Sequence, residues 1–574
     1  MVEDIENKIS LVEPRKTIEV HLPDARVLKG PRNCDIGTIL HALPEFDNPP
    51  IVGAVVNGVL RELTYQINMD SNVRPVTMGE SDGMRIYRRS LIFLLDTAFD
   101  QLFHKAILRV DHSIASGGYY CRVEGVPPLT NQEITKLEKS MRKLVAADLS
   151  FNREEVPLSH AISYFESEGE FDKVRLLSHR KKDYLTLYEL EGHYDYHQGY
   201  MVPSTGYLKW FRLESIEDGF TLRFPRQNSP TELSPFVKYP KLLNTFRQYR
   251  NWLSLLGISS VGTLNDDIKN DRVHEVILVS EALHEQRVSD IASQIASLQD
   301  RIRVVIVAGP SASGKTTFSK RLSVQLLALG IAPFPFEMDK YFIDRDKTPR
   351  NEDGEIDFES ITALNRERLS IDIRKLIAGE TVQLPCFDFL TGISTPGELV
   401  QLKSNEIIIL EGIHGLNPDL ILDFPSQKTF RIYVSALTQL NLDRHNRIST
   451  TDNRLLRRIV RDARERGYAA YETIKRWDSV RNGERINIFP YQEYADVMFN
   501  SALAYEMSAL KTSAEPLLRQ VPFGTPEYIE AKRLLAFLDW FLPLDNELIP
   551  DNSILREFIG DSILQDFSLW RNYE

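Results

Sequence analysis

Cysteine is scarce in this sequence, and its scarcity excludes two kinds of site. Only three cysteines occur among 574 residues, at Cys34, Cys121 and Cys386, and no CxxC pair is present. Such isolated positions suggest neither a disulfide framework nor a cysteine zinc site. We therefore expect three unpaired thiols in a reducing compartment.

Long apolar runs and an excess of basic charge are also missing. No run of about 18 apolar residues occurs, and the acidic start MVEDIENKIS lacks the basic flank and apolar core of a secretory signal. The formal net charge is -12, which argues against broad, non-specific binding to nucleic acid or to an anionic membrane. These features predict a cytoplasmic protein without a membrane partner.

The chain is long enough for several domains. Residues 16–84 hold two strand patterns, TIEVHL and IVGAVVNGVL, around the helical pattern DIGTILHAL, whose first Asp suits an N-cap; this favours a small α+β domain. Residues 85–225 mix helical patterns with aromatic-rich strands. Residues 226–300 read as a proline-rich linker and a long helical pattern, and residues 515–574 as a mostly helical extension.

Residues 301–514 follow a different pattern. Short apolar runs such as RVVIVAG, EIIILEG and TFRIYVSA alternate with helical patterns such as ITALNRERLSIDIRKLIAG and NRLLRRIVRDARERG. Strands that are apolar throughout are buried on both faces. The alternation therefore predicts an α/β domain with a parallel sheet that helices cover on both sides.

A glycine-rich loop follows the first of these strands. Residues 309–316 read GPSASGKT and fit G-x-x-x-x-G-K-[ST] between a strand and a helical pattern. Its backbone N–H groups can surround an anion, and the N-terminus of the next helix adds partial positive charge. We expect ATP to bind here with Mg²⁺. The residues expected to hold it are Gly309, Ser311, Ser313, Gly314, Lys315, Thr316 and Thr317.

Three downstream features narrow the chemistry. Glu411 ends the apolar strand EIIILEG, where a carboxylate can hold Mg²⁺ as the Thr316 hydroxyl does. Asp339 follows the strand after the loop helix and can accept a proton from an attacking hydroxyl. The pattern NRLLRRIVRDARERG carries arginines at 454, 457, 458, 461 and 464, near one helix face, as a lid would; loop carboxylates and a solvated helix are the simpler interpretations. No NKxD-like guanine signal follows, which argues against a GTPase.

Together, GPSASGKTT, MDKYF, LPCFDF, ILEGIHGL and RRIVRDARERG resemble the uridine kinase and phosphoribulokinase group of P-loop kinases over about residues 303–501. The resemblance implies that Asp339 is the base for the acceptor hydroxyl and that Glu411 helps to organise Mg²⁺. It implies a catalytic role for Lys315 and places Arg461 and Arg466 on the phosphates. On the acceptor side it implies contacts from Glu359, Phe387, Asp388 and Arg458.

The acceptor side departs from the pattern of that group. Phe387 replaces a tyrosine of the P-x-Y-D-F motif, and Phe342 replaces another tyrosine. Gly392 falls where uridine kinases carry a histidine that reads the pyrimidine. Losing hydrogen-bonding groups weakens discrimination between substrates that differ by a polar group. The phosphate machinery thus matches the group more closely than the base-reading groups do.

The N-terminal half resembles threonyl-tRNA synthetases. EVHLPDARV and IVGAVVNGVLREL are similar to the β-grasp TGS domain of that family, and REEVPLSHAISYF and DYHQGYMVPSTGYLKWFRL are similar to its α+β editing domain. There, an HxxxH pair and a later Cys and His form a metal-capable hydrolytic site. Here the four positions are Arg89, Phe93, His197 and Met201, so we expect no zinc and no aminoacyl-tRNA editing.

The sequence therefore predicts an ATP- and Mg²⁺-dependent kinase acting on a small-molecule hydroxyl, with the 5′-hydroxyl of a nucleoside such as uridine as the leading acceptor. Two alternatives stay open: a kinase of the same group for a sugar phosphate or another metabolite, and a regulatory, RNA-associated NTPase. The N-terminal half could bind RNA, sense a ligand or dimerise, and dimerisation would make the protein a homo-oligomer.

Overall fold

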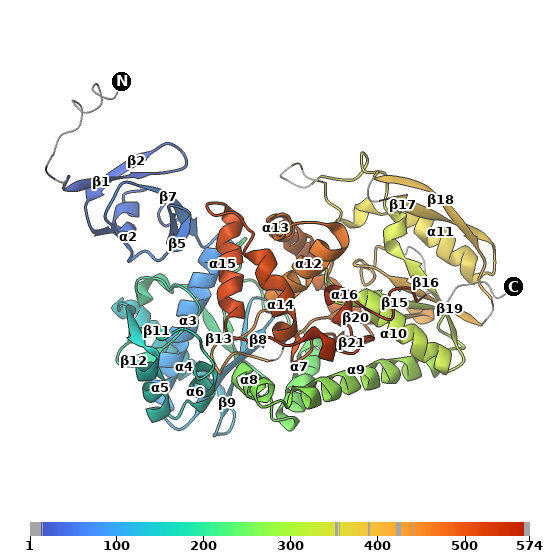
Figure 1. Ribbon diagram of the computed structural model, residues 1–574, viewed down its shortest axis with the longest axis horizontal. Coiled ribbons are helices and arrows are strands. Elements are labelled where there is room, and N and C mark those ends of the chain that lie inside the picture. The colour runs from blue at the N-terminus through green and yellow to red at the C-terminus, as the bar shows by residue number, and fades with distance from the viewer. Residues whose placement is uncertain are drawn as a thin grey trace. The chain divides into compact units, whose positions relative to one another are not determined.

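The computed structural model describes residues 13, 15–350, 354, 356–388, 391–403, 405–420, 426–438 and 440–567 (Figure 1). The acidic start of the chain and residues 568–574 of the expected helical extension lie outside the described residues. Within the described ranges, no helix combines the length and apolar character that crossing a membrane requires. The chain forms two compact units, of which the first comprises residues up to 161, 182–236 and 522–529, and the second the remainder.

The first unit begins with a five-stranded sheet of order β2-β1-β7-β4-β5, in which β1 and β7 are parallel and the other neighbours antiparallel. The elements of this part are β1 (Thr17–His21), β2 (Val27–Pro31), β3 (Cys34–Asp35), α2 (Ile36–Leu40), β4 (Ile51–Val56), β5 (Val59–Arg61), β6 (Gln66–Ile67) and β7 (Ser71–Thr77). The strands β3 and β6 pair with each other in a separate two-stranded sheet. Asp35 lies at the N-cap position of α2 as expected, but its side chain makes no capping hydrogen bond. Ile36, Ile39 and Leu40 of α2 join the apolar cluster of this sheet.

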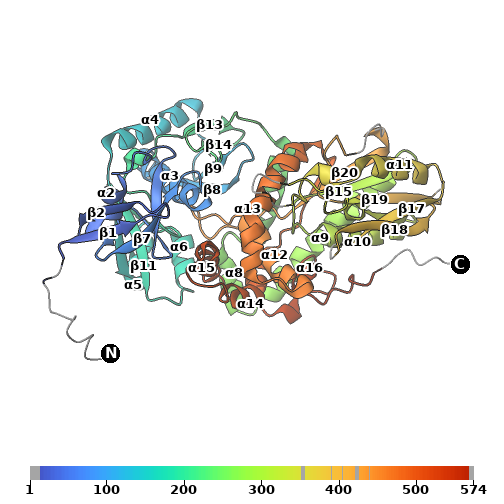
Figure 2. The ribbon, with the colours of Figure 1, turned by 90° about the horizontal axis from the view of Figure 1, so that it is seen from above.

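The rest of the first unit surrounds the long helix α3, Ser81–Leu102, along which α4 packs (Figure 2). Two antiparallel sheets accompany it, of order β13-β14-β9-β8 and β10-β11-β12. The elements are β8 (Ile107–Ser113), β9 (Gly118–Glu124), α4 (Asn131–Ala147), β10 (Asn152–Pro157), β11 (Tyr184–Leu190), β12 (His193–Asp195), β13 (Arg212–Ile216) and β14 (Gly219–Arg223). Helix α5 (Leu158–Ser167) begins in this unit and continues into the second. Leu91, Leu94 and Leu95 of α3 are fully buried in the core of this part.

The second unit contains the parallel sheet that the apolar runs predict. Its order is β16-β19-β15-β20-β21, and all neighbours are parallel. The strands are β15 (Val304–Ala308), β16 (Ala332–Glu337), β19 (Glu406–Glu411), β20 (Thr429–Ser435) and β21 (Val497–Asn500). Every residue of the central strand β15 is buried, as expected of a strand covered on both faces.

Helices pack around this sheet (Figures 1 and 2). Helix α10 contacts α9 and the strands β15, β16 and β19, while α11 contributes Leu369, Ile373 and Leu376 to a cluster with β15 and β19. The helices of this unit are α6 (Phe171–Leu177), α7 (Pro240–Leu255), α8 (Val261–Lys269), α9 (Val273–Ala296), α10 (Lys315–Ala328), α11 (Arg366–Ile377), α12 (Thr450–Arg466), α13 (Ala470–Asn487) and α14 (Glu506–Leu518). Helix α15 (Pro526–Leu538) and the short α16 (Arg556–Ile559) follow.

Three expectations for the second unit need correction. The helix expected over ITALNRERLSIDIRKLIAG begins only at Arg366, because Asn365 caps α11 by accepting the Arg368 N–H at 3.1 Å; Ile361–Ala363 is a 3₁₀ turn. The hairpin of β17 (Val382–Asp388) and β18 (Ile393–Val400) was not expected. In the last described part of the expected helical extension, residues 550–567, only Arg556–Ile559 form an α-helix, α16, which ends where Gly560 adopts a φ of 102°.

Candidate functional site

The loop of residues 309–314 joins the end of β15 to the start of α10. Ala312 and Gly314 have positive φ values of 56° and 83°, so the chain turns sharply between strand and helix. A Cβ atom on Gly309 would lie 1.9 Å from the Val434 carbonyl oxygen of β20, so only glycine fits there. The sequence motif therefore forms the strand–loop–helix arrangement that phosphate binding requires.

Several side chains of the loop and of the first turn of α10 are buried. Lys315 is 9% exposed, and its Nζ donates to the Pro310 carbonyl oxygen at 3.2 Å. The buried Ser313 hydroxyl has no hydrogen-bond partner among the described residues. Thr317, also buried, opens the first turn of α10 behind Lys315. A lysine held over the loop, with backbone donors around it, fits an anion such as a triphosphate.

Thr316 and Glu411 meet where α10 begins and β19 ends. The Thr316 hydroxyl donates to Glu411 Oε1 at 3.1 Å. Burial raises the pKa of Glu411 to about 7, with Glu557 and Asp339 acting in the same direction and Lys315 against it. A hydroxyl and a carboxylate at this separation are hard oxygen donors that one Mg²⁺ can share, so the residues present fit the ion.

Asp339 follows β16 on a 3₁₀ turn, Met338–Tyr341. Although its carboxyl group reaches solvent, the surrounding protein atoms raise its pKa, and the nearby Glu337 adds to this effect. Lys315 and Arg466 oppose the rise by electrostatic attraction. The carboxyl group thus lies within electrostatic range of Lys315 and of Arg466, which was expected in a lid. At this position it could accept the proton of a hydroxyl that attacks a phosphate.

The arginines of α12 include two sets that differ in burial and in partners, one near the start of the helix and one near its end. The first set is buried: Arg454 Nη2 donates to Glu484 Oε2 at 2.7 Å, and Arg457 Nη2 donates to Glu506 Oε2 at 2.8 Å. These ion pairs connect α12 to α13 and α14. Arg454 and Arg457 therefore hold the helix in place, because a buried guanidinium requires a paired carboxylate.

The second set of arginines gathers around one carboxylate. Arg458, Arg461 and Arg466 lie 3.2, 3.1 and 3.3 Å from the oxygens of Asp462. Burial lowers the pKa of Arg466, and the neighbouring charges of Arg461 and Arg458 lower it further, against Asp462. Arg458 Nη1 also donates to the Ser311 hydroxyl of the loop at 2.9 Å. Three guanidinium groups held around a single carboxylate offer N–H donors and positive charge to an anion.

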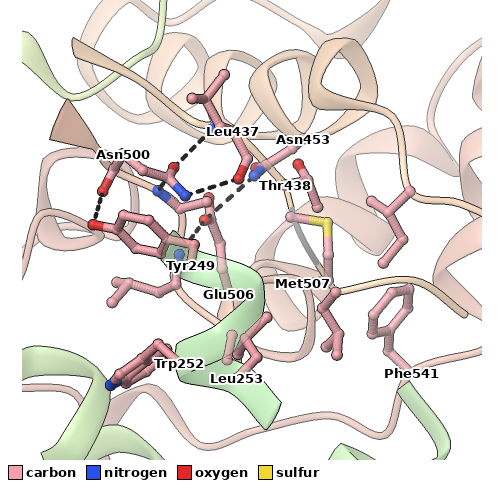
Figure 3. A pocket seen from close by; sticks show the side chains of 15 residues that line it. Tyr249, Trp252, Leu253, Leu437, Thr438, Asn453, Asn500, Glu506, Met507 and Phe541 are labelled. Atoms are coloured by element: carbon pink, nitrogen blue, oxygen red, sulfur yellow. Dashed lines mark hydrogen bonds between the residues drawn. The ribbon is translucent and has the colours of Figure 1, made fainter. Parts of the chain in front are cut away.

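A small cavity behind α12 shows how firmly the helix is seated (Figure 3). Asn500 Oδ1 accepts the Leu437 N–H at 2.8 Å, and the Tyr249 hydroxyl donates to the Asn500 carbonyl oxygen at 3.0 Å. Asn453 of α12 donates to Glu506 at 3.4 Å. The cavity volume of about 30 Å³ is far too small for a nucleotide or its acceptor, so this network is structural support.

Glu359 and the hairpin β17–β18 belong to the expected acceptor side. Burial raises the pKa of Glu359 to about 7, Glu484 adds to the rise, and Arg458 and Lys315 oppose it. Glu359 Oε2 is buried with no hydrogen-bond partner among the described residues. Asp388 is exposed at the end of β17, whereas Phe387 is 7% exposed, its ring centre 5.6 Å from that of Phe342.

Gly392 occupies the position at which a base-reading histidine was sought. It has a φ of 73°, and a Cβ atom there would lie 2.6 Å from Cβ of Arg345. The Arg345 N–H also donates to the Gly392 carbonyl oxygen at 2.8 Å. The hairpin turn therefore requires glycine here, and a histidine at this position would be strained.

Two carboxylates on the loop were missed by sequence reasoning. Glu484 Oε1 accepts the Ser311 N–H at 2.9 Å, and Glu557 Oε2 accepts the Thr317 N–H at 3.0 Å. Glu484 is buried on α13, and Glu557 lies on α16. The sequence offered one signal for Glu484, since an arginine-rich helix that is partly buried needs carboxylates from other elements.

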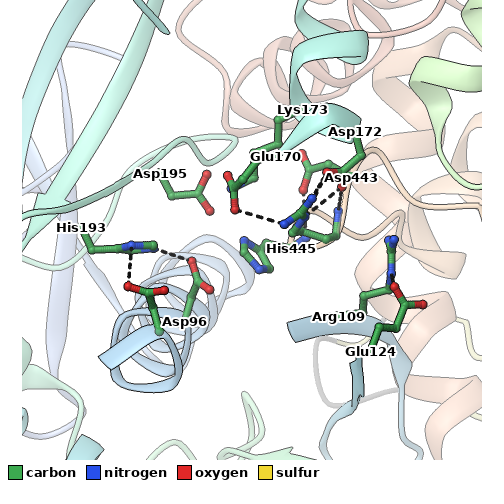
Figure 4. A network of polar contacts seen from close by, with 12 residues as sticks. Asp96, Arg109, Glu124, Glu170, Asp172, Lys173, His193, Asp195, Asp443 and His445 are labelled. Carbon is green, nitrogen blue, oxygen red and sulfur yellow. Dashed lines mark hydrogen bonds and ion pairs between the residues drawn. The ribbon is translucent and has the colours of Figure 1, made fainter. Parts of the chain in front are cut away.

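In the first unit, Phe93 and Met201, two of the four positions of the expected lost metal site, belong to one apolar core, and Phe93 contacts a third position, His197. The Phe93 ring lies 5.5 Å from the His197 ring, edge to face, and the Arg89 guanidinium packs against Gly199. Met201 is buried at 1% exposure. Nearby, His193 Nε2 lies 2.8 Å from Asp96 Oδ2 (Figure 4). Of the four positions, only His197 carries a side chain of the kind that commonly binds a metal.

Comparison with known proteins agrees with both resemblances. The threonine–tRNA ligase of Legionella pneumophila (strain Corby) is 32% identical over 203 residues, 35% of this chain and 32% of that protein. That of Laribacter hongkongensis (strain HLHK9) is 33% identical over 166 residues, 29% and 26% of the two chains. The chain thus spans about a third of the length of the curated relatives it matches.

A solved structure described as a possible uridine kinase from Bacillus stearothermophilus is 21% identical and covers 38% of this chain and 98% of its own, with a TM-score of 0.27. Residues 304–508 match the model of the phosphoribulokinase / uridine kinase family. The motifs therefore identified both relationships correctly: the N-terminal part is similar to threonine–tRNA ligases, and residues 304–508 match the model of the phosphoribulokinase / uridine kinase family.

Proposed function

We propose that the protein is an ATP- and Mg²⁺-dependent kinase that phosphorylates a hydroxyl of a small molecule, with the 5′-hydroxyl of a nucleoside such as uridine as the first acceptor to test. The observation that carries the proposal is the grouping of Lys315, Thr316, Glu411 and Asp339 at the carboxyl ends of the parallel strands. The family match over residues 304–508 supports the same class of reaction.

In such a reaction the acceptor oxygen bonds to the γ-phosphorus, the bond to the β–γ bridging oxygen breaks, and ADP leaves. Asp339 takes the proton of the acceptor hydroxyl. Lys315 and Arg466, both near Asp339, stabilise the negative charge on the transferring phosphoryl group. Arg461, beside Arg466, contributes to the same stabilisation. Mg²⁺ supplies further neutralisation of phosphate charge when bound, and Thr316 and Glu411 would hold it.

On the acceptor side, we assign contact with the substrate to Glu359, Arg458 and Asp388. Glu359 has a buried oxygen that lacks a partner among the described residues, and a sugar hydroxyl would provide one. Phe387 forms an apolar wall with Phe342 behind these groups. A carboxyl, a guanidinium and an apolar wall suit a ribose-like acceptor and do not choose among the bases.

For the N-terminal half, we propose a TGS-like β-grasp domain over residues 16–84 and an editing-like domain over residues 85–225. The mixed sheet with parallel β1 and β7 and the helix α2 support the first assignment. The similarity to threonine–tRNA ligases supports both. Because Arg89, Phe93 and Met201 stand at the metal-ligand positions, we assign this half no hydrolytic role.

The test is phosphate transfer from [γ-³²P]ATP with Mg²⁺ to a panel of nucleosides and pentose phosphates, using the wild type and Asp339→Asn. Without its proton acceptor the variant should lose about 10²- to 10⁴-fold in turnover while binding ATP with unchanged affinity. Asp346→Asn, the same chemical change on an exposed residue seven positions later, is the matched control and should keep wild-type activity.

The panel also separates the competing functions. Labelled product from a pentose phosphate but from no nucleoside would replace the nucleoside acceptor with the sugar-phosphate alternative. RNA-stimulated ATP hydrolysis without any labelled acceptor would refute the kinase in favour of the regulatory NTPase. Full activity of Asp339→Asn would remove Asp339 from the role of base.

A further inference from the structure

The first turn of α10 is occupied by a side chain from far along the chain. The early N–H groups of a helix have no partner inside the helix, and in a phosphate-binding loop they hold phosphate oxygens. Here the Thr317 N–H donates to the Glu557 carboxylate at 3.0 Å, across 240 residues of sequence. A negatively charged oxygen of the protein thus takes the place that a phosphate oxygen would take.

The segment that carries Glu557 is packed onto the loop and α10. Ile554 is fully buried, and its Cγ2 lies so near the loop that a Cβ atom on Gly314 would meet it at 2.7 Å. Lys320 of α10 donates to the carbonyl oxygens of Leu564 and Gln565 at 2.7 and 3.0 Å. Contacts on both sides of α16 therefore hold Glu557 at the start of α10.

Helix α12 holds the same segment from its other side. Arg464 Nη2 donates to the Glu557 carbonyl oxygen at 3.1 Å, and the Arg457 guanidinium lies 4.8 Å from the centre of the Phe558 ring. Phe558 is fully buried. The arginine-rich helix that borders the nucleotide site thus also positions the C-terminal segment.

Glu557 also changes the charge of the site. Its negative charge raises the pKa of Glu411, as the charge of Asp339 also does. Glu557 and Asp339 therefore both lie close enough to Glu411 to repel its charged form. A triphosphate is strongly negative and is repelled by each of them. Glu557 therefore opposes a phosphate in two ways, by occupying a donor and by adding like charge.

We propose that the segment around α16 is an autoinhibitory element of the nucleotide site, in which Glu557 and the phosphates of a nucleoside triphosphate compete for the Thr317 N–H. The inference rests on the proposed function, because it takes residues 309–317 to be the site of ATP. Its consequence is that ATP affinity depends on how firmly the C-terminal segment is held.

The test is isothermal titration of the full-length chain with a slowly hydrolysed ATP analogue and Mg²⁺. Glu557→Gln keeps the shape of the side chain but removes its charge, so it should bind the analogue about tenfold more tightly than the wild type, the factor expected when one competing charge-assisted hydrogen bond is lost. Glu557→Ala should bind more tightly too. Glu547→Gln, an equal change of charge on an exposed residue of the same C-terminal segment, should bind as the wild type does.

Thermal unfolding of the same proteins is a second test, in which Glu557→Gln should be less stable although it binds nucleotide more tightly. Because Glu557 caps α10, this variant should unfold at a lower temperature than the wild type without nucleotide. Equal or weaker binding by Glu557→Gln and Glu557→Ala, with the analogue still bound by the wild type, would overturn the autoinhibitory contact alone. No binding by any of these proteins would overturn the nucleotide site and this inference together.

Discussion

Among single residues, two carboxyl groups of the candidate site depart from their ordinary pKa. Glu411 and Glu359 both have pKa values raised to about 7, mainly by burial, and the raised value favours the protonated acid. Glu411 is also within hydrogen-bond distance of Thr316. A carboxyl that titrates near neutrality exchanges a proton for a cation within the physiological range of pH.

This predicts a pH-dependent requirement for Mg²⁺. The ion binds the deprotonated Glu411, so protons compete with it below pH 7, and half-saturation at pH 6 should need about tenfold more Mg²⁺ than at pH 8. The measurement is a Mg²⁺ titration of ATP turnover at the two pH values. Glu411→Gln cannot titrate at this position and should need more Mg²⁺ at both, with a smaller difference between them. Equal requirements in the wild type at pH 6 and pH 8 would contradict this role of Glu411.

The sequence indicated part of the candidate site and missed another part, for a physical reason. Thr316 belongs to a local motif and Glu411 ends an apolar strand, and parallel strands bring their carboxyl ends together, so their approach to 3.1 Å could be predicted. Glu484 and Glu557 contact the loop across 173 and 240 residues. No local pattern marks them, because only the packing of α13 and α16 brings them to the loop.

Among the elements, α12 combines structural support with a partly buried cluster of charge. Arg457 is completely buried and is paired with Glu506 on α14, while Arg461 and Arg466 gather around Asp462. Ser449 caps its start by accepting the Thr451 N–H, and Gly467 ends it with a φ of 67°. A helix fixed in this way can hold several like charges close together at its C-terminal end.

Arg457→Met should therefore destabilise the second unit strongly. The change leaves the Glu506 carboxylate buried without its guanidinium, and breaking a buried ion pair costs about 3–5 kcal/mol of unfolding free energy. Urea unfolding followed by fluorescence gives the value. Arg485→Met on the exposed face of α13 is the control and should cost less than about 1 kcal/mol. A loss for Arg457→Met as small as that of the control would show that the pair contributes little.

The elements themselves could be predicted unevenly. β15, β19 and β20 were predictable because parallel strands buried on both faces are apolar throughout. The hairpin β17–β18 was not, because Pro385 interrupts the first strand, the register shifts beside it, and the second strand is largely exposed. The C-terminal pattern gave too long a helix, since tertiary contacts of Ile554 and Phe558 determine that segment more than helical periodicity does.

Over the whole molecule, each of the two compact units is built from separate stretches of the chain. Residues 162–181 lie within residues 85–225, which we propose to be an editing-like domain, yet they pack with the second unit. Asp172 accepts the Arg444 backbone N–H and its Nε–H, both at 2.9 Å, beside Glu170 (Figure 4). Leu176 and Leu177 of α6 are buried. Sequence similarity follows contiguous residues, so it cannot detect a segment that completes a distant unit.

The isolated segment 237–574 should therefore be less stable than the same residues in the full chain. Without α6 it loses the partner of Arg444 and the burial of two leucines, together about 5 kcal/mol or more. Thermal unfolding, with nucleotide binding as the check of folding, makes the comparison. The full-length Asp172→Asn variant is the intermediate case, because it weakens only the ion pair. An unfolding temperature of the isolated segment equal to that of the full chain would contradict the role of residues 162–181.

Because Gly483 lies in close contact with Glu359, substitutions at Gly483 can be used to move the Glu359 side chain. A Cβ atom on Gly483 would lie 2.3 Å from Cβ of Glu359, so even a methyl group must push the acidic side chain off α13. Glu359 would then move relative to the acceptor, while the loop and β19 on the donor side keep their own contacts. Under the proposed function, side chains of increasing size at position 483 should displace Glu359 by increasing amounts. They would thereby change which acceptors bind while leaving the ATP site as it is.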